Sequence, residues 1–180
     1  MHPDRFGFQT GAFLNATLNQ EPLMPNYINW FTYDTLMDPS VFKEHGLECN
    51  AKFSVTLSAH KLAFNKIPLD SGGVENLGLP NIVPTNSNLG MMEGILYEIE
   101  ESFLPRLDEI YKYPDEYLRK KMRFTKHDFT LISGFVYIAH SDRTQDGLMP
   151  DKATLKHYRA CKRNLTMLYL SRLMNTPTVD

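Results

Sequence analysis

The sequence predicts a single α+β domain, and three observations support that class. Strand-like runs, a short helix, further strands and a terminal helix follow one another along the chain. The 180 residues suit one domain, and no internal repeat or linker divides them. Of these residues 42% are hydrophobic and 22% charged, which supplies enough apolar surface for a core. We expect residues 1–26 to be an N-terminal extension and residues 27–180 to be the domain.

The first half of the domain is expected to be mostly strand. Residues 28–33 (INWFTY) are apolar, aromatic and β-branched, which predicts a buried strand. Asp38 is placed to cap a short helix that starts at Pro39. Alternation over residues 51–64 predicts a strand pair or one long strand. Residues 68–88 then form a loop rich in Gly, Pro, Asn and Ser, which contains a short apolar run at positions 82 and 83.

The second half is expected to alternate strands and helices. Residues 91–99 predict a strand in which Gly94 marks a bulge or a close backbone approach. Residues 100–111 predict a helix, with Ser102 as its cap and Pro105 in its first turn. The remaining elements are a hairpin of residues 117–124 and 129–139, and one amphipathic terminal helix within residues 149–174.

Composition and residue spacing exclude several classes of function. The net charge of the chain is −2, whereas a nucleic-acid-binding protein usually carries a clustered surplus of basic residues. Cys49 and Cys161 lie far apart, and the six histidines form no zinc-binding pattern, so we expect neither a metal nor a cofactor. No apolar run approaches the ~18 residues of a membrane span and no secretion signal is visible, so we expect no membrane partner and a cytoplasmic location.

Three segments carry a resemblance to a known family. Residues 31–37 (FTYDTLM) are similar to F-x-Y-G-[ST]-[NL]-[LM], and residues 104–119 (LPRLDEIYKYPDEYLR) to L-x-x-L-D-x-x-E-G-x-P-x-x-Y-x-R. Between them, residues 60–97 hold HKLAFNKI, GGV, NIVP and MEGILYEI in the order of the same family's barrel core. Over roughly residues 28–140 the chain therefore resembles the gamma-glutamylcyclotransferase-like (AIG2-like) family. This resemblance implies a small mixed β-barrel with short helices and a C-terminal helix.

The resemblance also implies a reaction. Such enzymes cyclise a γ-glutamyl amine or amide to 5-oxoproline and release the amine. Backbone N–H groups of the strand-end loop hold the substrate, and a partly buried glutamate takes a proton from its α-ammonium. Carried over to this chain, the expected substrate-binding residues are Tyr33, Asp34, Thr35, Leu36 and Tyr117.

Two departures from the family pattern bear on the chemistry. Tyr111 stands where the motif has glutamate, and a phenol with a pKa of about 10 is a poor base. Asp34 stands where the loop has glycine, and its carboxylate would repel the substrate's own carboxylate. Tyr111 remains a candidate catalytic group as a proton donor, and Glu93 and Glu116 are the candidates for a relocated base, with Asp34 a further substitute.

Two classes of function stay open. The chain is either a cyclotransferase-like enzyme, with transferase or lyase chemistry on a γ-glutamyl compound, or a non-catalytic module that binds a small molecule on the same barrel. A structural role is the alternative for each aromatic or turn residue: Tyr33 as a core aromatic, Asp34 as a left-handed turn residue and Tyr111 as the end of a helix stripe.

Overall fold

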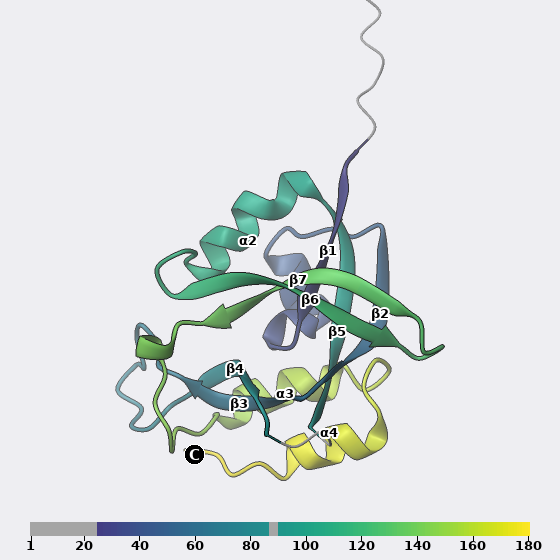
Figure 1. Ribbon diagram of the computed structural model, residues 1–180. Helices are drawn as coiled ribbons and strands as arrows, with labels where there is room; N and C mark the ends of the chain where they lie inside the picture. The colour runs from purple at the N-terminus through teal and green to yellow at the C-terminus, as the bar shows by residue number, and fades with distance from the viewer. Residues whose placement is uncertain (1–24, 87–89) are drawn as a thin grey trace, which may run out of the picture.

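The computed structural model describes residues 25–86 and 90–180, and its centre is a closed barrel (Figure 1). Around the barrel the strand order is β1-β5-β2-β6-β7, and every pairing is antiparallel except that of β1 with β7. The predicted mixed barrel is therefore confirmed. Its strands are β1 (Tyr27–Thr32), β2 (Ala51–Ser58), β5 (Met91–Glu100), β6 (Tyr117–Lys126) and β7 (Leu131–Ala139).

A separate two-stranded sheet lies beside the barrel. It pairs β3 (His60–Lys66) with β4 (Leu79–Pro84). Ala59, in the left-handed region at φ 57°, separates β2 from β3, so residues 51–64 form two strands that pair with different partners. The apolar run at positions 82 and 83 belongs to β4, as the NIVP resemblance implies.

Short helices flank the barrel on two sides (Figure 1). Helix α2 lies at one end of the barrel, whereas α3 and α4 lie beyond the β3–β4 sheet on the opposite side. The helical elements are η1 (Thr35–Met37), α1 (Pro39–Glu44), η2 (Glu101–Phe103), α2 (Leu104–Tyr111), η3 (Ser141–Arg143), α3 (Lys152–Ala160) and α4 (Met167–Met174). Asp38 caps α1 ahead of Pro39 as predicted, with its side chain accepting from the Ser40 N–H.

Two expectations about the helices are wrong. The terminal helix is two helices, because the chain turns after α3 and Thr166 starts α4 by accepting a hydrogen bond from the Tyr169 N–H. Ser102 does not cap α2, which begins without a side-chain cap. The Ser102 hydroxyl instead donates to the Glu100 carboxylate at 3.3 Å. The predicted extension lies almost entirely outside the described residues.

The core fixes the end of β1, from which the site begins. Phe31 points into a cluster inside the barrel and stacks on Phe124 at 4.4 Å, whereas Trp30 packs in the second cluster with Tyr97 and Tyr111. A Cβ at Gly94 would lie 2.6 Å from the Phe31 ring, which confirms the expected close approach there. With both faces buried, β1 delivers the following loop to a fixed position.

Candidate functional site

The loop after β1 is anchored through the backbone and side chain of Tyr33. The buried Tyr33 phenol donates to the Tyr137 carbonyl at 2.8 Å, and the Tyr33 carbonyl accepts from the Tyr158 phenol at 2.9 Å. These bonds tie the loop to β7 and α3. The Tyr33 side chain therefore lies in the core beneath the loop and is not among the residues that line the adjoining pocket.

Asp34 is the most strongly held side chain of this loop. Its Oδ1 accepts from the Leu36 N–H at 2.9 Å and from the Thr32 hydroxyl at 3.0 Å, and its Oδ2 accepts from the Tyr111 phenol at 2.7 Å. Burial raises the pKa of the Asp34 carboxyl, while these hydrogen bonds oppose the rise. The Asp34 backbone is extended, with φ −111° and ψ −159°, so the expected left-handed turn is absent.

Tyr111 ends α2 and serves both as core and as a wall of the site. Its ring stacks on Tyr137 at 4.1 Å and meets Tyr117 edge-on at 5.3 Å, while its hydroxyl reaches Asp34. Burial and the neighbouring Asp34 charge raise the pKa of the Tyr111 phenol well above its usual value. Tyr111 is therefore a neutral hydrogen-bond donor at physiological pH.

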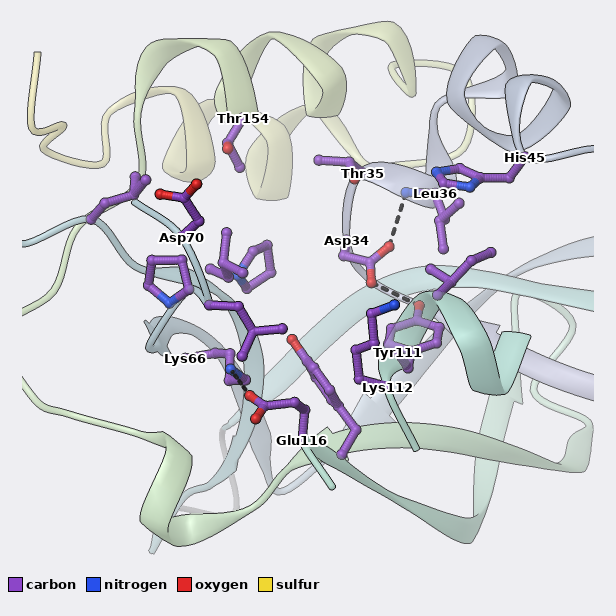
Figure 2. A pocket seen from close by; sticks show the side chains of 17 residues that line it. Asp34, Thr35, Leu36, His45, Lys66, Asp70, Tyr111, Lys112, Glu116 and Thr154 are labelled. Atoms are coloured by element: carbon purple, nitrogen blue, oxygen red, sulfur yellow. Dashed lines mark hydrogen bonds and ion pairs between the residues drawn. The ribbon is translucent and has the colours of Figure 1, made fainter. Parts of the chain in front are cut away.

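A pocket of about 410 Å³ opens beside this pair (Figure 2). It brings together predicted site residues from two separate motifs, at residues 31–37 and 104–119. The predicted site residues on its wall are Asp34, Thr35, Leu36, Tyr111, Glu116 and Tyr117. The volume lies at the small end of the range for small-molecule sites.

Glu116 lines the pocket but is neutralised by two cations. Its Oε2 accepts from the Lys66 ammonium at 2.6 Å, and its Oε1 lies 3.3 Å from Arg143 Nε. The Lys66 ammonium also donates to the Ile67 carbonyl, and the Lys66 side chain is only 2% exposed. Both oxygens of the Glu116 carboxylate are therefore engaged by cations of the protein itself.

Glu93 lies outside the pocket. Its two carboxylate oxygens accept from the Thr166 N–H at 2.6 Å and the Thr166 hydroxyl at 2.5 Å. The residue at position 93 therefore connects β5 to the start of α4, where a negative charge is also favoured by the helix dipole. The structure does not bring this carboxylate to the residues of the other motifs.

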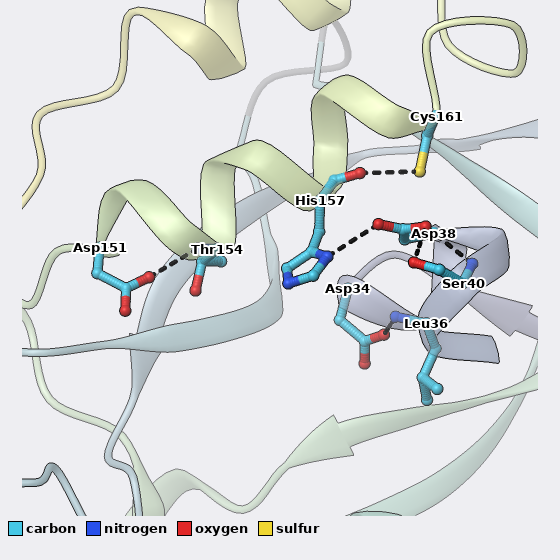
Figure 3. Close-up of polar contacts among 8 residues, drawn as sticks. All are labelled: Asp34, Leu36, Asp38, Ser40, Asp151, Thr154, His157 and Cys161. Atoms are coloured by element: carbon cyan, nitrogen blue, oxygen red, sulfur yellow. Dashed lines mark hydrogen bonds and ion pairs between the residues drawn. The ribbon is translucent and has the colours of Figure 1, made fainter. Parts of the chain in front are cut away.

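Behind the loop, His157 on α3 is bound to the cap of α1 (Figure 3). Its Nδ1 lies 2.9 Å from Asp38 Oδ2, and Asp38 Oδ1 accepts from the Ser40 hydroxyl at 2.8 Å. Burial raises the pKa of the Asp38 carboxyl, but the bonds from His157 and Ser40 outweigh it, and the pKa is lowered. Cys161 donates to the His157 carbonyl, and burial raises the pKa of its thiol to about 12, which makes it a poor nucleophile.

Several pocket residues were not predicted from the sequence. They are His45, Lys66, Asp70, Lys112 and Thr154, together with apolar residues of the 67–80 segment. For two of these residues the sequence contains a feature that could have identified them. Lys112 follows Tyr111 where the family motif has glycine, and its left-handed backbone at φ 50° keeps the conformation that glycine favours. Alternation along β3 places Lys66 on the same face as the buried Phe64.

Within residues 25–86 and 90–180, no group of three or more His, Cys, Asp or Glu side chains is placed to hold a metal ion. The same part of the chain has no helix long and apolar enough to cross a membrane.

Comparison with known proteins gives the class to which this fold and pocket belong. The family model described as gamma-glutamyl cyclotransferase, AIG2-like, matches residues 30–160. This chain belongs to that family. A comparison with the curated proteins finds no match.

Solved structures share the fold at low sequence identity. A protein described as gamma-glutamyl cyclotransferase has a TM-score of 0.71 and 16% identity, covering 85% of this chain and 89% of that one. An uncharacterized protein from Homo sapiens has a TM-score of 0.71 and 16% identity, and the match covers 84% of this chain and 89% of that one. YkqA from Bacillus subtilis has a TM-score of 0.70 and 15% identity, and the match covers 85% of this chain and 56% of that one. At these identities the likeness supports the barrel fold alone.

Proposed function

We propose that this chain binds a γ-glutamyl amine or amide in the pocket beside Asp34 and cyclises it to 5-oxoproline. The observation that carries the proposal is the Asp34 carboxylate itself, which lines the pocket with a pKa raised by burial. A carboxylate whose pKa is shifted upward is better matched to proton transfer near neutral pH than an ordinary one. The proposed ligand is a small molecule, which suits the pocket of about 410 Å³. The cytoplasmic location expected from the sequence is part of the same proposal.

In the proposed reaction, Asp34 accepts a proton from the substrate's α-ammonium. The free amine nitrogen then attacks the γ-carbonyl carbon, so a ring C–N bond forms. The bond from that carbon to the leaving nitrogen breaks as the proton held on Asp34 passes to that nitrogen. The ring nitrogen, which carries two hydrogens after the attack, loses one of them to the Asp34 carboxylate and becomes the lactam N–H, and Asp34 then releases this second proton to the departing amine. Because attack is intramolecular, holding the γ-glutamyl chain in a cyclising conformation contributes much of the rate.

The other candidate groups suit this role less well. Tyr111 is a neutral donor that orients Asp34 Oδ2, Glu116 is bound by Lys66 and Arg143, and Glu93 is bound at the start of α4. Asp34 Oδ2 has one hydrogen bond from the protein, so it keeps a lone pair for a substrate proton.

The test is 5-oxoproline release by purified protein from γ-glutamyl amino acids and γ-glutamylamines. We expect turnover by the unmodified chain and a loss of about 100-fold or more in Asp34→Asn, the range for removal of a general base. Glu93→Gln, outside the pocket, serves as the matched carboxylate control and should retain turnover. Full activity of Asp34→Asn would refute the assignment of the base.

A second function is favoured by one contact. The Leu36 N–H, a loop amide that would otherwise face an anionic ligand, already donates to Asp34 Oδ1. A loop whose amide is satisfied internally suits a module that binds a ligand without turnover. Calorimetric binding of a γ-glutamyl amino acid with no 5-oxoproline release would support this second function over the first.

A further inference from the structure

The pocket contains two opposite charges that do not neutralise each other, Asp34 and Lys112. Asp34 comes from the loop after β1 and Lys112 directly follows α2, and both side chains line the same pocket (Figure 2). Neither forms an ion pair with any residue in the described part of the chain, and the two are not within 4.0 Å of one another. Each charge is therefore open to an external group.

The remaining charged groups of the pocket have other environments. Lys66 and Glu116 bind each other, and Arg143 adds to that pair from outside the pocket. Asp70 is exposed, like Lys112, but its carboxylate already accepts a hydrogen bond from the Gly72 N–H of its own loop at 2.8 Å. His45 is half-buried at the end of α1 and has no ion pair within the described residues.

We propose that Asp34 and Lys112 together bind an α-amino-acid head group, with the ammonium on Asp34 and the adjacent carboxylate on Lys112. This inference rests on the proposed function and assigns the orientation of its substrate. The ammonium meets Asp34 Oδ2, because Oδ1 already accepts two hydrogen bonds from the Leu36 N–H and the Thr32 hydroxyl. The carboxylate turns away from Asp34 and towards the ammonium of Lys112.

The orientation follows from the charges around Tyr111. With a carboxylate on the loop side, the loop repels a ligand carboxylate and attracts an ammonium. Lys112 provides a cation at the other side, and its left-handed backbone holds its Cα just past the helix end. The pocket thus has a negative group on the loop side and a positive group on the helix side, which matches the two neighbouring charges of an α-amino acid.

Three p-nitroanilides that differ in one charge each test the proposal. γ-Glutamyl-p-nitroanilide carries both head-group charges, 4-aminobutyryl-p-nitroanilide lacks the α-carboxylate, and glutaryl-p-nitroanilide lacks the ammonium. Binding is measured by calorimetry. We expect Lys112→Gln to weaken the γ-glutamyl probe about two- to fivefold, the upper part of the range for one exposed ion pair. It should leave the 4-aminobutyryl probe unchanged, and Lys112→Arg should restore binding.

Asp34→Asn should weaken both ammonium-bearing probes and leave the glutaryl probe unaffected or more tightly bound. Lys120→Met, which removes an exposed lysine of β6 outside the pocket, is the matched control. Equal effects of Lys112→Gln on the γ-glutamyl and 4-aminobutyryl probes would overturn the assignment of the carboxylate, even if turnover is found. Charge-selective binding without 5-oxoproline release would instead support the head-group site and refute the reaction.

Discussion

The phenol of Tyr111 donates a 2.7 Å hydrogen bond to Asp34 Oδ2, joining two residues that lie 77 positions apart. Both positions were predicted from the sequence to differ from the motifs of the family, and in the fold the two residues are hydrogen-bond partners. The carboxylate that the helix end lacks at position 111 is present on the loop at position 34. The fold therefore places both residues on the wall of one pocket rather than in two separate places.

Removal of the Tyr111 hydroxyl should alter the pH dependence of the site. In Tyr111→Phe the Asp34 carboxylate loses one of the hydrogen bonds that lower its pKa, so its pKa should rise and the acidic limb of the pH–rate profile should move to higher pH. The free energy of unfolding should fall by about 1.5–3 kcal/mol, the range for a hydrogen bond to a charged group. Urea denaturation and rate measurements from pH 4 to 9 check both effects.

Tyr137→Phe is the matched control for that experiment. It also removes a phenol that donates to a carboxylate, Asp108 Oδ1 at 2.6 Å, but this pair does not line the pocket. It should change stability and leave the pH–rate profile in place. A profile that moves equally in both variants would argue against a specific effect of Tyr111 on Asp34.

Asp34→Asn should change how stability depends on pH. Because burial raises the native pKa of Asp34 above its unfolded value, folding favours the protonated form. Its contribution to stability is thus complete below the unfolded pKa of about 3.9 and is lost as the pH rises through the native pKa. The asparagine variant lacks this loss, so its stability relative to the unmodified chain should increase from pH 4 to pH 8 in urea denaturation.

Asp128→Asn provides a control of opposite sign. Hydrogen bonds from Thr130 lower the pKa of the Asp128 carboxyl, so its contribution is present above the unfolded pKa and is lost as the pH falls through the native one. The Asp128→Asn variant should therefore lose relative stability as the pH rises. The same pH trend in both variants would contradict the raised pKa of Asp34.

The buried pair of Lys66 and Glu116 should be sensitive to removal of one partner. Lys66→Met leaves a buried carboxylate with only the more distant Arg143, and we expect a loss of about 3 kcal/mol in the free energy of unfolding. Adding Glu116→Leu should recover part of that loss, because the unpaired charge is removed as well. Chemical denaturation of the two single variants and the double variant measures the coupling.

An exposed ion pair with the same N···O distance tests whether burial or distance sets the energetic contribution of the Lys66–Glu116 pair. Arg106 and Glu109 also lie 2.6 Å apart, but their side chains are 47% and 63% exposed. Arg106→Met should cost less than about 1 kcal/mol. Similar losses for Lys66→Met and Arg106→Met would show that burial does not govern these ion pairs.

Glu93→Gln should affect stability and leave ligand binding unchanged. The substitution weakens the two hydrogen bonds from Thr166 that start α4, and a loss of about 1–2 kcal/mol is expected. Glu75→Gln, on an exposed loop position, is the control and should be neutral. Thermal unfolding and calorimetry with a γ-glutamyl amino acid are the measurements. Weaker ligand binding by Glu93→Gln without a loss of stability would instead indicate that Glu93 takes part in binding the ligand.

Local patterns predicted the strands well. Residues 28–33 and 91–99 correspond to β1 and β5 because both runs are rich in apolar, aromatic and β-branched residues, which suit a strand buried along most of its length. The division of the terminal helix was missed because the apolar stripe continues across it. What separates α3 from α4 is a turn held by Glu93, a residue more than 70 positions away.

The sequence by itself determined the barrel and predicted that Asp34 and Tyr111 are unusual positions. Only the tertiary structure decided what these residues contact, because periodicity and capping act over a few neighbours, whereas the bond from Tyr111 to Asp34 joins positions 77 apart. The same holds for the charges, since Lys66, Glu116 and Lys112 acquire their roles from what lies next to them after folding. Burial and pairing determine whether a carboxylate is a base or a structural anion, and both are properties of the folded chain.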